Sequence, residues 1–186
     1  MATREDGVPT PLAARLRDGS ASGVWELDPR RSSVEFRVKH FWGMVTVRGQ
    51  FTSFQGAATI DPSGVISGTM RIDAASVESR QARRDAHLRS ADFFHADDHP
   101  TISFQTRQVS PRDDDRVRVV GDLTAAGRTR PIEFEARVTD ATADRLRAVA
   151  EITIDRTEFG MTWSPMGMTS SEVLVVVQGE LARSST

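Results

Sequence analysis

The chain has 186 residues, a formal net charge of −2 and no cysteine. This length suits one domain that buries roughly two thirds of its unfolded surface. The composition excludes disulfides, thiol catalysis and zinc sites with cysteine ligands, and it argues against a general nucleic-acid binder.

Residues 1–22 predict a flexible N-terminal extension, and residues 23–186 predict a single folded domain. Prolines, glycine and serines interrupt the extension, which has room for at most one helical turn at 11–17. The start, Met1–Gly7, has mixed charge and lacks the apolar core of a secretory signal, so a cytoplasmic location is expected. No apolar run approaches the roughly 18 residues of a transmembrane helix.

Apolar and polar residues alternate from Val34 onward, a period of two that predicts strands with one buried face. Similar segments recur at 45–51, 54–60, 66–72, 102–104, 117–121, 132–138, 146–154 and 173–181. About eight short antiparallel strands form a sandwich or a closed barrel, and an eight-stranded barrel is filled by side chains or holds one small ligand. Small residues at inward positions favour a cavity: Ala57, Ala136, Ala148 and Ala150.

The stretch from Val77 to Arg89 breaks the alternating pattern and predicts a short helix over the mouth or side of the barrel. Ser79 is a candidate helix cap, and Ala82 and Ala86 lie four residues apart. Pro100 then ends any helical conformation. Charged, histidine and aromatic residues crowd together only here.

Several short motifs, in a fixed order, resemble those of one protein family. They are Trp25–Pro29, Val38–His40, Val47–Phe51, Arg84-Asp85-x-His87-Leu88-Arg89-Ser90-x-Asp92-Phe93-Phe94, His99–Phe104, Gly121–Thr124, Gly127–Pro131 and Arg156-x-x-Phe159-Gly160. Together they resemble the YceI-like, polyisoprenoid-binding family over about Val24 to Leu181. Two positions depart from its pattern: Arg31 stands where histidine is common, and Ala125 takes the place of the usual apolar residue after Leu-Thr.

The resemblance implies an all-β fold: an extended, lipocalin-like, eight-stranded antiparallel barrel with a short helix packed against it. It also implies an apolar tunnel, no established catalysis and no cofactor other than a bound isoprenoid lipid. The expected function is non-enzymatic binding, transport or sequestration of a polyprenyl phosphate or an isoprenoid quinone. The oligomeric state stays open, with a homodimer among the alternatives.

An isoprenoid tail needs a dry, narrow channel, and large or inward-facing apolar residues are the candidates to line it. The methionines near the C-terminal turn suit an irregular chain because their side chains adapt in shape. For each residue, filling a core is the alternative role. The tunnel candidates are Phe36, Val38, Phe51, Phe54, Met70, Ile72, Phe104, Phe134, Ala136, Ala148, Ile152, Met161, Met166, Met168 and Val175.

Basic residues of the predicted helix are the candidates for a head group at the tunnel mouth. They are Arg80, Arg83, Arg84, His87 and Arg89. Arginine offers a planar fork of N–H donors that matches phosphate oxygens. The alternative is a solvated helix face, and within the family motif Arg84, Asp85 and His87 are more simply read as ties between helix and barrel.

A second function class is a metal-dependent or hydrolytic enzyme that uses Asp85, His87, His95 and His99. Imidazole and carboxylate are zinc ligands. However, Pro100 favours an extended His99, which breaks the helical spacing with His95. The chain also lacks the nucleophile elbow, the phosphate-binding loop and the dinucleotide fingerprint, so no catalytic residue is assigned.

Overall fold

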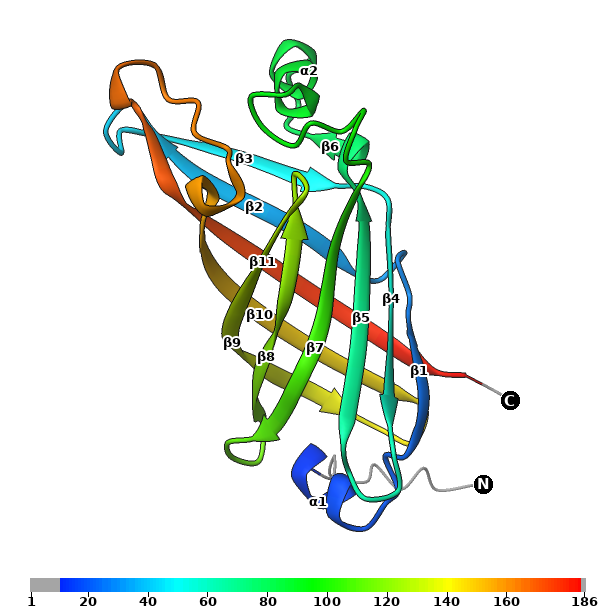
Figure 1. Cartoon of the computed structure of the whole chain (residues 1–186). Helices are drawn as coiled ribbons and strands as arrows, with labels where there is room; N and C mark the ends of the chain where they lie inside the picture. The colour runs from blue at the N-terminus through cyan, green and yellow to red at the C-terminus, as the bar shows by residue number, and fades with distance from the viewer. Residues whose placement is uncertain (1–10, 185–186) are drawn as a thin grey trace, which may run out of the picture.

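The computed structural model describes residues 11–184 and consists mainly of β-strands (Figure 1). The strands are β1 (Gly23–Leu27), β2 (Ser33–His40), β3 (Val45–Phe51), β4 (Phe54–Ile60), β5 (Ile66–Asp73), β6 (Val77–Glu78), β7 (Thr101–Pro111), β8 (Arg116–Ala125), β9 (Arg128–Ala141), β10 (Arg145–Asp155) and β11 (Thr169–Arg183). The helical elements are α1 (Leu12–Arg17), η1 (Ala74–Ser76), α2 (Ala82–Arg89), η2 (Arg156–Phe159) and η3 (Pro165–Gly167).

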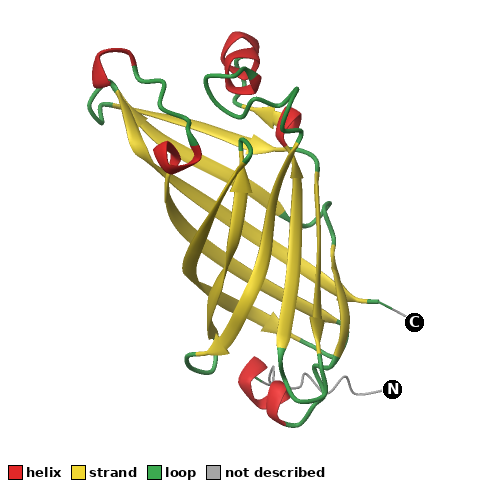
Figure 2. Cartoon of the chain, viewed as in Figure 1, coloured by secondary structure: helices red, strands yellow, loops and turns green. Residues whose placement is uncertain are grey.

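Eight of these strands close an antiparallel barrel in the order β1-β4-β5-β7-β8-β9-β10-β11, with β11 returning to β1. This confirms the expected all-β fold, with strands β2, β3 and β6 added outside the closed ring and α2 lying over one end (Figure 2). The alternating pattern predicted about eight strands, whereas the whole sheet has eleven.

The length of β11 explains the extended shape. Its last residues pair with β1, Leu181 opposite Leu27, whereas its earlier residues pair along the same edge with β2, Gln178 opposite Ser33. The barrel is thus closed at one end, called the closed end here, and β2 and β3 prolong its wall at the other, called the open end (Figure 1).

The two ends also differ because β9 and β10 pair only in the half near the closed end. Their register runs from Leu146 opposite Ala141 to Ala150 opposite Ala136. Beyond Ala150, β10 pairs only with β11, and η2 lies against β9. The wall therefore spreads toward the open end, which makes room inside it.

A cluster of buried side chains fills the closed end. Leu12 and Leu16 of α1 are buried there with Trp25, whose side chain has no exposed surface and whose indole N–H donates to the Ala21 carbonyl at 2.9 Å. Residues 12–21 therefore differ from the flexible extension expected over 1–22: helix α1 forms a plug, because its two leucines are one turn apart on one face. Residues 1–10 of that extension lie outside the described residues.

The alanines that were expected to leave a cavity lie mostly in this filled half. Ala136 and Ala150 are buried in the same cluster as Leu12 and Trp25. The plug formed by α1 occupies the space beside these alanines. The strand pattern alone did not reveal this.

Glu180 is a buried carboxylate held by three arginines. Its oxygens lie 2.7 Å from Arg147 and 3.2 Å from both Arg31 and Arg145. Burial alone would raise the pKa of Glu180, but the hydrogen bond from Arg147 and the three positive charges bring it below its usual value. A lowered carboxyl pKa stabilises the fold above the unfolded-state value, and this stability is lost as the pH falls through the folded-state pKa.

We expect Glu180→Gln to lower the Tm at pH 7, because three guanidinium groups lose their common counter-charge. The variant should also lose less stability than the wild type when the pH falls from 7 to 3. Thermal unfolding followed by circular dichroism over that range checks both points. An unchanged Tm at pH 7, or an unchanged acid dependence, would contradict the role of Glu180.

Candidate functional site

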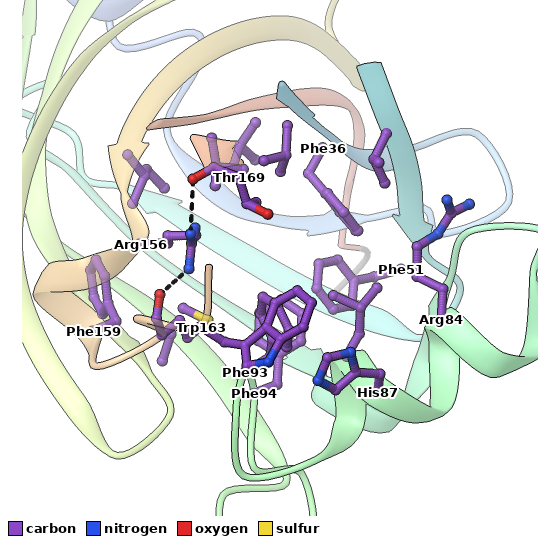
Figure 3. A pocket seen from close by; sticks show the side chains of 18 of the residues that line it. Phe36, Phe51, Arg84, His87, Phe93, Phe94, Arg156, Phe159, Trp163 and Thr169 are labelled. Atoms are coloured by element: carbon purple, nitrogen blue, oxygen red, sulfur yellow. Dashed lines mark hydrogen bonds between the residues drawn. The ribbon is translucent and has the colours of Figure 1, made fainter. Parts of the chain in front are cut away.

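A cavity of about 780 Å³ occupies the open end of the barrel (Figure 3). Its walls come from β2, β3 and β11, from one or two positions each on β5, β7, β8 and β10, and from α2, η2 and the segments that follow these two helices. The residues that line it are Val34, Phe36, Val38, His40, Phe41, Val45, Val47, Phe51, Ile72, Gln81, Arg83, Arg84, His87, Leu88, Phe93, Phe94, Ile102, Leu123, Ala125, Ile154, Arg156, Phe159, Met161, Trp163, Thr169, Val173 and Val175. Most are aliphatic or aromatic, so the cavity suits an apolar ligand.

Strand alternation supplies the apolar wall. Val38 and Phe36 of β2 face the cavity together with their neighbours Val173 and Val175 of β11. Gly49 of β3 lies opposite Phe36, and a Cβ atom at Gly49 would collide with the phenyl ring. The glycine therefore lets this ring lie flat against the wall instead of filling the space.

Helix α2 covers the cavity, and a short network fixes its start. Asp85 is buried and accepts hydrogen bonds from the backbone N–H of Ser79, at 2.8 Å, and from its hydroxyl. Arg84 donates to the Ser79 hydroxyl at 2.6 Å and to its carbonyl at 2.5 Å. Ser79 was predicted to cap the helix. Instead, the left-handed Arg80 (φ 62°) folds Ser79 back against Asp85, and Gln81 precedes the first turn without a side-chain cap.

Arg156 is the buried charge of the site. Only 4 % of its surface is exposed, and its guanidinium donates to the carbonyls of Ser170 (2.8 Å), Thr169 (3.3 Å) and Met161 (Figure 3). Burial lowers the pKa of Arg156 below its usual value, while the neighbouring Asp155 opposes this shift. Its pKa starts so high that the group stays cationic at neutral pH.

The charged part of the lining is basic. Arg83, Arg84 and Arg156 line the cavity with two histidines, and none of the lining residues in the described chain is acidic. Arg156 and Arg84 lie on opposite sides of the cavity (Figure 3). The site therefore combines an apolar interior with positive charge at two separate places.

His87 of helix α2 contacts the loop that follows η2. Its Nε2 atom lies 3.0 Å from a carboxylate oxygen of Asp92, and its ring contacts Trp163 edge-on with centroids 4.5 Å apart. Phe93 packs against both rings. All three rings line the cavity, so this aromatic cluster forms part of its wall.

The structure brings six of the fifteen tunnel candidates to the cavity: Phe36, Val38, Phe51, Ile72, Met161 and Val175. The other nine do not line it. Phe104, Phe134, Ala136 and Ile152 belong to the filled half, Phe54 and Met70 pack against the core of the open half, and Ala148 lies between the paired parts of β9 and β11. Met166 is 81 % exposed because its loop turns outward, and Met168 ends the same loop.

Three of the five mouth candidates, Arg83, Arg84 and His87, line the cavity. Arg89 points away from it and donates to the carbonyls of Ala75 (2.7 Å) and Val77 (2.9 Å), so it anchors α2 to the strand before it. Arg80 is exposed at the turn before α2.

The four residues proposed for a metal-dependent or hydrolytic enzyme do not form one site, because they make separate contacts. Asp85 is bound to Ser79, His87 faces Asp92, and His95 lies 3.0 Å from Asp98 with the His99 ring beside it. Within residues 11–184, no three histidine or carboxylate side chains come together in a metal-binding arrangement.

Several lining residues were absent from the sequence prediction although a signal for them existed. Val34, Val45, Val47 and Val173 share the alternating phase of predicted lining residues on their own strands. Phe93 and Phe94 are part of the long motif after α2 and were overlooked because they lie outside any strand. Arg156 was noted only as part of a motif, and nothing in its charge alone indicated burial.

Comparison with known proteins agrees with this architecture. The model of the YceI-like domain matches residues 25–181. A UPF0312 protein of Vibrio cholerae is 32% identical over 140 residues, 74% of each chain, and one of Pectobacterium carotovorum is 31% identical over 171 residues, 88% of each chain.

Solved structures share the fold. Burkholderia cenocepacia BcnA superposes with a TM-score of 0.76 at 21% identity, covering 83% of this chain and 98% of its own. A polyisoprenoid binding domain from Saccharophagus degradans gives a TM-score of 0.71 at 16% identity, covering 86% and 98%. Among the described residues no helix is long and apolar enough to cross a membrane. The match over nearly the whole barrel shows that the chain belongs to the YceI-like family.

Proposed function

We propose that this protein binds one isoprenoid lipid in the cavity of its open end, without catalysis, and carries or sequesters it. The observation that carries the proposal is the apolar cavity of about 780 Å³ inside a barrel of this family. The polyisoprenoid binding domain with the same fold supports the choice of lipid class. A cytoplasmic location is part of the proposal, and cell fractionation tests it.

The size of the cavity sets how much lipid it can hold. Pockets of roughly 300–1,000 Å³ enclose ligands of drug size, so this one suits a single short chain. Burial of one five-carbon isoprene unit contributes roughly 3–4 kcal/mol before ordering costs, so a few units already give strong binding. Because α1 and Trp25 fill the closed end, a longer tail would fold back or leave through the mouth.

The basic lining favours one of the two expected head groups. Arg83, Arg84 and Arg156 face the cavity without an acidic neighbour in the lining. A phosphate would supply a counter-charge to all three. The guanidinium donors of Arg84 and Arg156 are already used on Ser79 and on three carbonyls, so Arg83 is the arginine whose forked N–H donors a phosphate would accept. A neutral quinone would leave the arginines of the lining without a counter-charge inside the cavity, so we propose a polyprenyl phosphate rather than a quinone.

We expect the protein to bind a polyprenyl phosphate about tenfold or more tighter than the polyprenol of equal length, since a hydrogen bond to a charged group contributes about 1.5–3 kcal/mol. Arg83→Gln should reduce this preference, and Arg156→Gln should reduce it further. Competition followed by native mass spectrometry measures the ratio.

Arg80→Gln is the matched control, because Arg80 is exposed beside α2 and does not line the cavity. Arg156 also holds three carbonyls, so its variant is compared only after circular dichroism shows a folded barrel. Equal affinity of the wild type for both lipids would refute the phosphate assignment and leave isoprenoid binding itself standing.

A further inference from the structure

Exposed apolar side chains gather on one side of the open end. Six of the eight large hydrophobic residues that are exposed in the described chain lie in two neighbouring loops at the open end. They are Phe41, Trp42, Met44 and Val45 at the β2–β3 turn and Trp163 and Met166 after η2, and we call them the apolar rim. Such a cluster on an otherwise polar surface marks an interaction site.

The two loops are adjacent. His40, which precedes the first loop, pairs with Thr169, which follows the second, and their side chains are 2.8 Å apart. Phe41, Val45 and Trp163 are exposed on the outside and also line the cavity. The apolar rim is therefore continuous with the cavity wall.

The first loop holds its aromatic residues in an unusual backbone conformation. Phe41 and Trp42 have φ angles of 50° and 52°, in the left-handed region that bulky residues rarely adopt. Trp42 and Met44 gain little packing in return, with 70 % and 78 % of their surface exposed. Strain of this kind is typical of functional loops.

The outer face of the same hairpin is basic. Arg37 of β2 lies directly opposite Arg48 of β3, and Lys39 lies two residues further along β2. No acidic residue occurs between positions 37 and 48. Like charges directly opposite each other destabilise a strand pair, and no ion pair of the described residues neutralises these three groups. Acidic residues flank this stretch: Glu35 lies two residues before Arg37 on β2, and Glu172 precedes Val173, which pairs with Val38. The positive excess therefore belongs to the part of the hairpin nearest its turn.

The geometry points to an anionic lipid bilayer as the partner of the apolar rim: Trp42, Met44 and Met166 enter the headgroup region while Arg37, Lys39 and Arg48 contact acidic headgroups. Tryptophan favours the membrane interface, and basic residues near it gain about 1 kcal/mol each from anionic lipid. When the protein is docked in this way, the cavity opens toward the bilayer. A lipid could then pass from the bilayer into the cavity without crossing water. This inference goes beyond the proposed function, because docking requires no ligand in the cavity.

The test is flotation of the purified wild type with vesicles of phosphatidylcholine, with and without phosphatidylglycerol. We expect binding to the phosphatidylglycerol vesicles that weakens at high salt, with a blue shift of tryptophan emission. The double variant Trp42→Ser/Met44→Ser should lower the partition coefficient at least about tenfold. Arg37→Gln/Arg48→Gln should lower it about fivefold for each charge removed, and only with phosphatidylglycerol present.

Val65→Ser is the matched control, because Val65 is 61 % exposed in the β4–β5 turn at the closed end (Figure 1). It should bind vesicles like the wild type. No wild-type binding at low salt, or equal binding of the rim variant, would overturn the inference. Sedimentation velocity supplies another contrary outcome: a stable dimer that dissociates in the rim variant would assign the rim to a second copy of the chain. Lipid uptake in solution is measured separately, so failure of docking is distinguishable from failure of the proposed function.

Discussion

Replacing Val175 with tryptophan is expected to reduce binding of an isoprenoid lipid at least about tenfold. Val175 lies in the middle of β11, opposite Phe36, and faces the cavity. The added indole enters space that the ligand would occupy, so each displaced methylene removes roughly 0.8 kcal/mol of binding energy. The fold should tolerate the change because the larger side chain meets a cavity rather than a packed core.

Val175→Ala is the matched control at the same position. It widens the cavity and should retain lipid binding, at a cost of about 1–3 kcal/mol in folding stability. Titration of both variants with a short-chain polyprenyl phosphate, followed by native mass spectrometry, measures the two affinities. Undiminished binding by Val175→Trp would show that the ligand lies elsewhere.

The second large effect concerns stability. Trp25→Ala should lower the free energy of unfolding by about 3–5 kcal/mol. The Trp25 side chain is fully buried, its indole N–H donates to Ala21, and the Arg183 guanidinium lies 4.7 Å from its ring centroid. The change therefore removes a large apolar group from the plug at the closed end and leaves the Ala21 carbonyl without its donor.

Trp42→Ala is the control, because it removes the same side chain from an exposed position. It should change the free energy of unfolding by no more than about 0.5 kcal/mol. Urea unfolding followed by circular dichroism compares the two. A loss below about 1 kcal/mol in Trp25→Ala would contradict the view that the closed end is a packed plug.

The alternating pattern was sufficient to predict antiparallel strands with one inner face, in a sandwich or a closed barrel, and the family resemblance selected the barrel. Val34, Phe36 and Val38 alternate with polar residues, so their common face could be assigned before the structure was known, and Phe36 and Val38 do line the cavity. The family motifs likewise indicated a helix over the barrel near Arg84 and His87.

The position of the cavity within the barrel could not be predicted in this way. It depends on contacts between segments far apart in sequence: α1 fills the space beside Ala136 and Ala150, and β9 separates from β10 beyond Ala150. Strand periodicity carries no information about either event. As a result, the tunnel prediction was spread along the whole barrel, whereas the cavity occupies only the open end.

The burial of the Arg156 charge could not be predicted for a related reason. Arg156 follows an ordinary alternating strand, and its burial arises because the segment up to Ser170 folds back and offers three carbonyl groups. Met166 shows the opposite case: an apolar residue expected inside, which a left-handed backbone (φ 51°) holds in an exposed loop.

The most direct test of the central claim is native mass spectrometry of the full chain, before and after addition of a short-chain polyprenyl phosphate. The protein is expected to carry or take up one lipid per chain, and organic extraction should release a molecule whose mass contains five-carbon repeats. A protein that yields no lipid on extraction and takes up neither polyprenyl phosphate nor quinone would contradict isoprenoid binding.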